Sequence, residues 1–278
     1  MMHLFHKVSN DCSRIATERY STSFSSAIRL LHRSMRTPVC NIYGFVRFAD
    51  EIVDSFHGFN KQGLLGEFKA ETYKAIVQEI SLNPILNSFQ QTVNAYKIDI
   101  KLVDAFFCSM EFDLDKTTYD AEGYRQYIYG SAEVVGLMCL YVFCEGDAKK
   151  FEELKPAAKA LGAAFQKVNF LRDVKNDYQQ LNRTYFPGVD FANFSTLHKK
   201  QVEEDIANDF ALAYQGILHL PVKARFGVYV AYKYYFSLFK KIKKSQPASL
   251  LESRIRIPDY AKAFIVMRAG LRSHLNLL

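Results

Sequence analysis

Residues 165–177 read Phe-Gln-Lys-Val-Asn-Phe-Leu-Arg-Asp-Val-Lys-Asn-Asp, and this pattern is typical of a helix with one polar stripe. Gln166, Asn169, Asp173 and Asp177 recur at i, i+3, i+7 and i+11, so they share one face of an α-helix. Four of the eight residues between them are apolar: Val168, Phe170, Leu171 and Val174. The stretch therefore predicts a helix that buries much of its surface and presents amide and carboxylate groups along one line.

A second stretch has the same character. Tyr43, Arg47, Asp50 and Asp54 follow at i, i+4, i+7 and i+11, again among apolar residues. Each stretch holds two aspartates four residues apart, about 6 Å along a helix axis, where they repel each other unless Arg, Lys or a bound cation lies nearby. Carboxylate oxygens at this spacing suit Mg²⁺. Two such stripes that face each other across a bundle would form a polar rim on an apolar cavity, a place for a diphosphate on an apolar tail.

The rest of the chain shows helical periodicity as well, with few strand-like stretches. There is no internal repeat, linker or shift in composition, so we expect one all-α domain over residues 1–278. Turn and capping residues divide it into about ten helices. They are expected over residues 9–33, 39–56 (with Pro38 in the first turn), 61–80, 84–96, 100–114, 122–143, 151–180 (bent near Pro156), 198–218, 221–244 and 258–274, with a non-helical connection over 181–196.

The composition limits the class of protein. With 278 residues, 49% of them hydrophobic and 23% charged, the chain is neither collagen-like nor disordered. The net charge of +7 suggests an anionic partner: a nucleic acid, a phosphorylated small molecule or an acidic membrane surface. Basic residues are dispersed rather than gathered in a nucleic-acid-binding motif, so we expect no nucleic-acid partner. Five separated cysteines without a CxxC pair fit a reducing cytoplasm.

Membrane contact is expected to be peripheral at most. No apolar run approaches the roughly 18 residues of a membrane span, and residues 134–142 form the strongest candidate. The first ten residues lack the features of a signal peptide. Lys240, Lys241, Lys243 and Lys244 follow an aromatic stretch, which fits either a solvated helix end or a patch that contacts a membrane surface.

Residues 47–54 and 165–177 strongly resemble the two aspartate-rich signatures of the squalene/phytoene synthase family. Three further segments agree with the family in order and spacing: residues 20–24, 127–136 and 183–187. The resemblance covers residues 12–256 and is nearest to bacterial phytoene synthases of carotenoid biosynthesis. It implies an isoprenoid-synthase-type helical bundle around a central apolar cavity.

The resemblance also implies roles for individual residues. The Mg²⁺ ligands, with Mn²⁺ as an alternative ion, would be Asp50, Asp54, Asp173 and Asp177, which would act in catalysis with Tyr43 and Tyr127. The implied substrate-binding residues are Ser21, Ser23, Arg47, Gln166, Asn169, Arg172, Arg183, Tyr185, Tyr235 and Arg254. The chain departs from the commoner pattern at Tyr20, Thr22 and Asn176, where many members have His, Lys and an acidic residue.

The implied activity is a head-to-head condensation of two geranylgeranyl diphosphates to phytoene, with release of diphosphate. The same chemistry on farnesyl diphosphate, which gives dehydrosqualene or squalene, is the alternative. A non-catalytic helical assembly protein is a further alternative, but such a protein would be expected to lose the four aspartates.

Either a helix or a substrate chain would approach closely at Ala132 and Gly136. The expected cavity lining is Phe24, Phe45, Phe48, Val134, Val135, Leu137, Met138 and Phe165.

Overall fold

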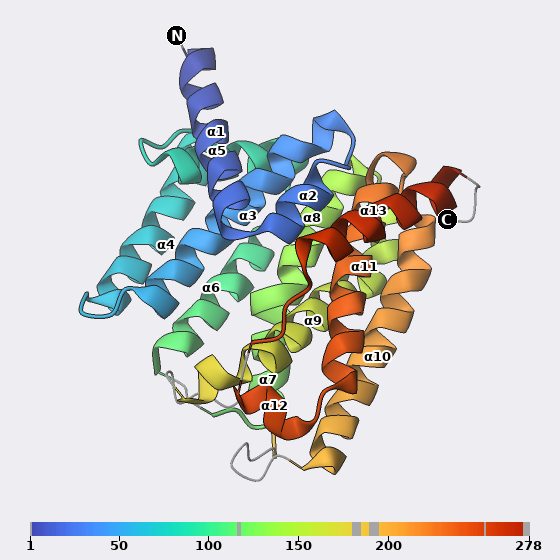
Figure 1. Cartoon of the computed structure of the whole chain (residues 1–278). Helices are drawn as coiled ribbons and strands as arrows, with labels where there is room; N and C mark the ends of the chain where they lie inside the picture. Colours follow the sequence, from blue (N-terminus) through green and yellow to red (C-terminus); the bar gives the residue numbers. More distant parts are fainter. Residues whose placement is uncertain (1, 116–117, 180–184, 189–194, 253, 275–278) are drawn as a thin grey trace.

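The computed structural model describes residues 2–115, 118–179, 185–188, 195–252 and 254–274, and side chains at 176–179, 251, 252, 259 and 272–274 lie outside the described set. The all-α prediction is confirmed, because these ranges contain helices and no strand. Figure 1 shows the helices packed around one another along the whole molecule. They are α1 (Met2–Tyr20), α2 (Thr22–Ile28), α3 (Arg33–Ser55), α4 (Lys61–Gln78), α5 (Pro84–Tyr96), α6 (Ile100–Asp115), α7 (Ala121–Ile128), the π-helix η1 (Tyr129–Glu133), α8 (Val134–Cys144), α9 (Ala148–Gln179), α10 (Thr196–His219), α11 (Val222–Lys244), α12 (Pro247–Glu252) and α13 (Asp259–His274).

Capping residues explain why several of these helices begin where the sequence predicts. The side chain of Asn83 accepts hydrogen bonds from the first backbone amides of α5, and Pro84 fills the first helical position. Asn60 caps α4 and Asp120 caps α7 through the backbone amides three residues on. Each cap supplies an acceptor to an N–H group that has no partner within its own helix.

The first predicted helix is wrong in its bounds. Residues 9–33 do not form one helix, because the helical backbone breaks at Ser21 (φ −144°, ψ 105°). The first helix, α1, also begins earlier than predicted, at Met2. The Ser21 hydroxyl accepts a hydrogen bond from the amide of Phe24 at 3.1 Å, which makes Ser21 the N-cap of α2. A serine side chain that competes with the backbone for hydrogen bonds favours such a break.

Two further boundaries differ from the prediction. The second helix begins at Arg33, where the His32 ring caps it, so Pro38 lies inside α3 rather than in its first turn. Pro38 lacks an amide donor, which removes one hydrogen bond near the start of a long helix. The long helix α9 runs from Ala148 through Pro156, and α12 is a short helix that the sequence did not predict.

The segment predicted as one helix over 122–143 contains a π-helical turn, η1. A Cβ atom at Gly130 would lie 2.2 Å from the carbonyl oxygen of Ala105, so only glycine allows α6 to approach this turn. The hydroxyl of Ser109 on α6 donates to the carbonyls of Gln126 (3.4 Å) and Tyr127 (3.3 Å), at the start of the turn. The π-turn thereby fixes the place of Tyr127, one of the predicted site residues.

Aromatic packing fills the core on the α3 side of the molecule. Phe45 is fully buried and its ring stacks on Phe89 with a centroid separation of 3.8 Å, while Phe106 and Phe107 pack beside it. One stretch of the described chain, Ala121–Cys144, is long and apolar enough to span a membrane, but 61% of its most apolar window is buried inside the protein. Burial in the core accounts for its apolar composition.

Candidate active site

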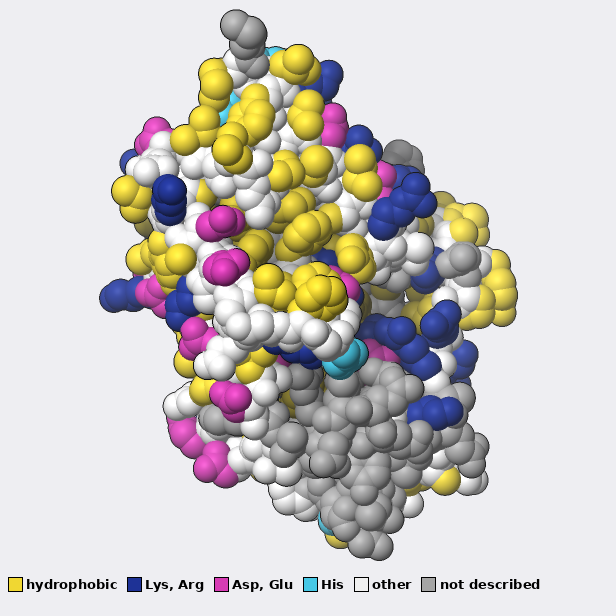
Figure 2. All heavy atoms as spheres, turned by 90° about the vertical axis from the view of Figure 1, so that its left-hand side faces the viewer, with side chains coloured by type: hydrophobic (Ala, Val, Ile, Leu, Met, Phe, Trp, Pro, Cys, Tyr) yellow, Lys and Arg dark blue, Asp and Glu magenta, His cyan; other side chains and the backbone are white. Residues whose placement is uncertain are grey.

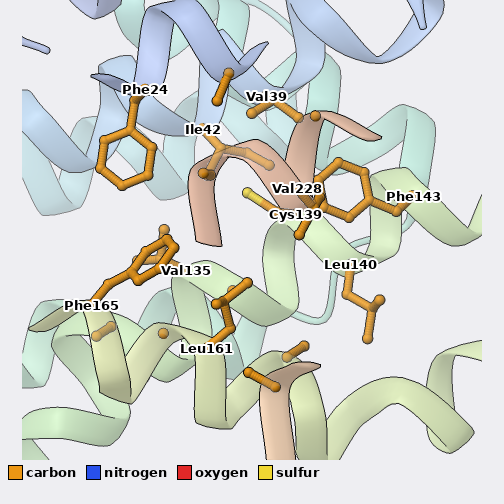
Figure 3. A pocket seen from close by; sticks show the side chains of 18 of the residues that line it. Phe24, Val39, Ile42, Val135, Cys139, Leu140, Phe143, Leu161, Phe165 and Val228 are labelled. Carbon is orange, nitrogen blue, oxygen red and sulfur yellow. The ribbon is translucent and has the colours of Figure 1, made fainter. Parts of the chain in front are cut away.

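A cavity of about 270 Å³ lies among α2, α3, α8, α9, α10 and α11. Its wall is almost entirely apolar, and Figure 3 shows side chains from these separate helices converging on it. Three residues expected at this wall, Phe24, Val135 and Phe165, are confirmed there. The described lining also includes Ile28, Leu31, Val39, Ile42, Val46, Cys139, Leu140, Phe143, Leu161, Leu220 and Val228.

The other expected lining residues point elsewhere. Phe48 lies on the surface with 39% of its area exposed. Phe45, Val134, Leu137 and Met138 are buried in the core but do not line the cavity. All five belong to α3 or α8, and each of these helices has one face toward the cavity and another toward neighbouring helices. The sequence showed that these helices are apolar, but it did not show which residues face the cavity.

Close helix packing accounts for the small residues that the sequence analysis singled out. A Cβ atom at Gly136 would meet the carbonyl oxygen of Ala158 at 2.7 Å, and one at Gly162 would meet that of Ala132 at 2.5 Å. These contacts bring the backbones of the α8 segment and α9 together. Gly136, Gly162 and Ala132 also border the cavity, so the close approach shapes its wall.

Besides Ser131 of η1, the polar side chains on the described cavity wall gather at one part of it: Tyr43 from α3, Gln166 and Asn169 from α9, and Tyr235 from α11. The Asn169 amide donates to Gln166 Oε1 at 3.5 Å, while Asn169 Oδ1 is buried without a hydrogen-bond partner in the described chain. Burial raises the pKa of Tyr43 to about 12, with Arg47 opposing the shift. Tyr43 therefore carries its proton at neutral pH and can donate a hydrogen bond.

Three aromatic rings meet at this polar part of the wall. The Tyr235 ring stacks on Phe165 with a centroid separation of 3.9 Å, and the Phe24 ring lies 5.6 Å from Tyr235 and 5.9 Å from Phe165. Burial raises the pKa of Tyr235, while Arg172 and Asn169 oppose the shift. Three aromatic rings that line the cavity thus pack together where the apolar wall meets the polar groups.

The polar stripe of α3 is held by Arg47. Its guanidinium donates to Asp50 Oδ2 at 2.5 Å and also pairs with Glu51. The same guanidinium lies over the ring of Tyr20, 4.4 Å from its centroid. Burial alone would lower the pKa of Arg47, but the carboxylates of Asp50 and Glu51 raise it overall. Tyr20, which departs from the commoner family pattern, thus supports the arginine of the first signature.

The polar stripe of α9 holds Asp173 between two arginines. Arg172 Nε donates to Asp173 Oδ1 at 3.0 Å, and Arg254 Nε lies 2.7 Å from the same oxygen, so both guanidinium groups bind this carboxylate. Burial and the neighbouring Arg172 lower the pKa of Arg254, whereas its interaction with Asp173 raises it. Asp177 lies on α9 one turn further on, but its side chain is outside the described residues. Arg183 lies wholly outside them.

Tyr127 and Tyr185 are buried on a neighbouring side of the site. The Tyr127 hydroxyl donates to Asp113 Oδ2 on α6 at 2.8 Å, and the Tyr185 ring stacks on Phe170 at 3.9 Å. Burial raises the pKa of Tyr127 well above its ordinary value, and Asp113 and Asp54 are among the further causes. Tyr127 is therefore within electrostatic reach of Asp54, one member of the first aspartate pair, but it does not line the described cavity.

The structure places the remaining predicted residues at the start of α2. Ser21 caps that helix and also interacts with the Tyr43 phenol, whereas Ser23 is half-buried in its first turn. Sequence reasoning missed two partners of the site. Asp113 carried no motif, and Lys262 of α13 donates to the Thr22 hydroxyl at 2.8 Å from 240 residues away in the chain.

The donor set fits a hard divalent cation in chemistry. Asp50 and Asp54 stand one turn apart on α3, and Asp173 and Asp177 hold positions one turn apart along α9; carboxylates are the ligands that such a cation prefers. Within the described residues, however, no group of three or more His, Cys, Asp or Glu side chains comes together. The arginines that hold Asp50 and Asp173 supply the positive charge at these carboxylates.

The sequence matches the squalene/phytoene synthase family model over residues 17–261. The chain belongs to the squalene/phytoene synthase family. Its similarity to a dehydrosqualene synthase crystal structure extends over 98% of both chains, with a TM-score of 0.84 and 19% identity. A squalene synthase from Alicyclobacillus acidocaldarius matches with a TM-score of 0.73 and 19% identity over 86% of this chain and 94% of that one. These likenesses confirm the isoprenoid-synthase-type fold.

Relatives of this synthase family have more than one name. A phytoene synthase of Arthrospira platensis is 24% identical over 95% of this chain and 93% of its own length. A 4,4'-diapophytoene synthase of Staphylococcus haemolyticus is 26% identical over 71% of this chain and 68% of its own. A presqualene diphosphate synthase of Rhodopseudomonas palustris is 27% identical over 60% of this chain and 58% of its own. Family and relatives together support a synthase of the head-to-head prenyl diphosphate type.

Proposed function

We propose that the protein condenses two geranylgeranyl diphosphates head to head, releases diphosphate and forms phytoene. The observation that carries the proposal is the apolar cavity whose polar wall lies next to two helices with paired aspartates and arginines. A prenyl diphosphate has the same division, with an apolar chain and an anionic end. The phytoene product is favoured by the Arthrospira platensis relative, since that similarity extends over nearly the full length of both proteins.

The arginines would bind the diphosphate ends. Arg47, Arg172 and Arg254 each present a planar guanidinium that can hold two phosphate oxygens at once. In the structure these groups pair with Asp50, Glu51 and Asp173. When bound by Asp50, Asp54, Asp173 and Asp177, Mg²⁺ would supply further positive charge for the departing diphosphate.

The reaction requires that a C–O bond of one donor breaks, which leaves an allylic cation and free diphosphate. The alkene of the second donor attacks that cation to form a C–C bond, and loss of a proton from the resulting cation closes a cyclopropane ring, which gives a cyclopropylcarbinyl diphosphate. A second ionisation, a rearrangement and the loss of a proton then give phytoene. Each cation must be kept from water, and the apolar lining of the cavity would do so.

The aromatic residues would stabilise the positive charge. Phe24, Phe165 and Tyr235 line the cavity at the junction of the apolar and polar walls, where their π-electrons would attract a cation that forms next to the diphosphate. Tyr43, with a pKa of about 12, offers a protonated hydroxyl at neutral pH. It therefore presents no phenolate that would capture the cation.

The test is to incubate the purified protein with Mg²⁺ and each prenyl diphosphate separately, then to identify the hydrocarbon product. We expect phytoene from geranylgeranyl diphosphate and little product from farnesyl diphosphate. Formation of dehydrosqualene from farnesyl diphosphate alone would establish the alternative, which the Staphylococcus haemolyticus relative favours. The absence of any hydrocarbon or presqualene-type product from both donors would exclude the synthase function.

A further inference from the structure

Helix α13 has one face that packs on the protein. Ile265 and Val266 pack against the hydrophobic core, and Ala269 is 3% exposed. The same helix contacts α11, and Lys262 on this inner side reaches the Thr22 hydroxyl of α2. The inner face thus has the apolar character expected of a helix that covers a core.

The opposite face of α13 is also apolar, but it is exposed. Tyr260, Phe264, Met267 and Leu271 have 80%, 56%, 58% and 60% of their areas exposed. Their spacing of i, i+4, i+7 and i+11 aligns them in one stripe about 16 Å long. A helix that is apolar on two opposite faces is expected to be covered on both.

We propose that this α13 stripe (Tyr260, Phe264, Met267 and Leu271) docks on the surface of a lipid bilayer. Charge favours lipid: between Asp259 and His274 the helix carries one acidic residue, and besides Lys262, which lies on the packed side, it carries the basic residues Arg268 and Arg272. Arg268 is exposed beside the stripe, where it can meet anionic headgroups. An apolar face with aromatic residues and flanking basic residues is the pattern of a helix that lies in the membrane interface.

The size of the stripe argues against a second copy of the chain as the occupant. Its four exposed side chains offer roughly 500 Å², whereas a stable protein interface buries about 800 Å² on each partner. A bilayer has no such minimum, because interfacial binding grows with the apolar area that is inserted. The choice of lipid also rests on the proposed function, since both the prenyl substrate and the hydrocarbon product would partition into a bilayer.

The position of α13 connects this surface to the site. Lys262 joins its inner face to Thr22 at the start of α2, the helix whose Phe24 lines the cavity. The lysine cluster Lys240–Lys244 is a different surface. It lies in the last turns of α11, a helix about 35 Å long, whereas α13 crosses the other end of that helix (Figure 1). Figure 1 shows α13 across the upper part of α11 and the last turn of α11 at its lower end, next to α12.

The experiment is flotation of the full-length protein with vesicles of 70% phosphatidylcholine and 30% phosphatidylglycerol, without substrate. The test variant is Phe264→Asp with Met267→Asp, which changes two exposed side chains and leaves the packed face of α13 intact. We expect its vesicle partition coefficient to fall about tenfold or more from that of the wild-type protein. Arg268→Glu should weaken binding to these vesicles but not to neutral phosphatidylcholine vesicles.

Two control variants locate the effect. Figure 2 shows that the face on the left of Figure 1 also carries apolar side chains among charged ones. The control for apolar exposure is therefore Val77→Asp with Leu82→Asp, at residues 82% and 91% exposed at and just after the end of α4. The control for charge is Lys243→Glu with Lys244→Glu. Both controls should bind vesicles like the wild-type protein, and circular dichroism should show that all variants are folded.

Several results would overturn the proposal. The first is a wild-type protein that does not float with the vesicles. The second is a Phe264/Met267 variant that floats as well as the wild-type protein, and the third is a loss of flotation in the lysine variant alone. A dimer in solution that becomes a monomer in the Phe264/Met267 variant would instead identify a second copy as the occupant. Because flotation needs no substrate, vesicle binding without hydrocarbon synthesis would contradict only the proposed function, and synthesis without vesicle binding would contradict only this inference.

Discussion

The buried hydrogen bond between Tyr127 and Asp113 gives a prediction whose size follows from the structure. The Tyr127 hydroxyl is 2.8 Å from Asp113 Oδ2, and the two residues are 3% and 7% exposed. Tyr127→Phe removes the donor and leaves a buried carboxylate with one hydrogen bond fewer. A hydrogen bond to a charged group contributes about 1.5–3 kcal/mol, so we expect the free energy of unfolding to fall by about 2 kcal/mol.

The assay is urea unfolding followed by circular dichroism, together with the thermal midpoint. For a chain of 278 residues, 2 kcal/mol corresponds to a fall in the thermal midpoint of about 3–4 °C. Asp113→Asn keeps an acceptor and removes the charge, so it should cost about 1 kcal/mol or less. If the two groups interact directly, the double variant should be more stable than the sum of the two single changes predicts, by about 1 kcal/mol or more.

The matched control is Tyr260→Phe, because that side chain is 80% exposed and its hydroxyl can hydrogen-bond to water. It should change the unfolding free energy by less than about 0.5 kcal/mol. Strict additivity of Tyr127→Phe and Asp113→Asn would refute the reasoning. So would a Tyr127→Phe variant whose stability matches that of the control.

Three other changes test the site and the core. Asp50→Asn or Asp173→Asn should lower turnover by about 100-fold or more with an unchanged circular dichroism spectrum, since each removes a carboxylate proposed to hold Mg²⁺; near-normal turnover would contradict that assignment. Phe45→Ala should lower the free energy of unfolding by about 3–5 kcal/mol, as measured in urea, because the ring is fully buried and stacked on Phe89; a loss below about 1 kcal/mol would contradict this packing. Tyr43 has a pKa of about 12 in the folded protein and an ordinary pKa of 10 in the unfolded chain, so between pH 10 and pH 12 the folded protein keeps a proton that the unfolded chain loses. The contribution of Tyr43 to the free energy of unfolding is therefore complete below pH 10. It falls by about 1.4 kcal/mol per pH unit up to pH 12. The free energy of unfolding of Tyr43→Phe should therefore fall less steeply with pH than that of the wild-type protein over that range. Equal slopes would show that burial does not perturb Tyr43.

Local patterns account for what the sequence predicted about the fold. The helices over 61–78, 84–96 and 222–244 lie close to their predicted bounds, because capping residues and i, i+4 periodicity act within a few turns. The break at Ser21 and the π-turn at 129–133 were missed. The π-turn depends on where a neighbouring helix lies, since α6 must approach Gly130, whereas the break at Ser21 is a local N-cap that the sequence analysis overlooked.

The same division applies to the candidate site. Each polar stripe pairs its arginine with an aspartate of the same helix, as Arg47 does with Asp50 and Arg172 with Asp173, and this spacing is visible in the sequence. The long-range partners are not visible there. Asp113 binds Tyr127 and Lys262 binds Thr22, yet neither residue belongs to a motif. Their roles come from the packing of α6 and α13.

By itself, the sequence determined that the protein is helical, that it carries two aspartate-rich stripes and that it resembles one synthase family. These features are periodic or contiguous, so side chains three to four residues apart specify them without reference to the rest of the chain. Only the tertiary structure decided that Phe24, Val135 and Phe165 face the cavity whereas Phe45 and Met138 face the core. It also decided that the outer face of α13 is exposed, because an apolar residue carries no information about which neighbour will cover it.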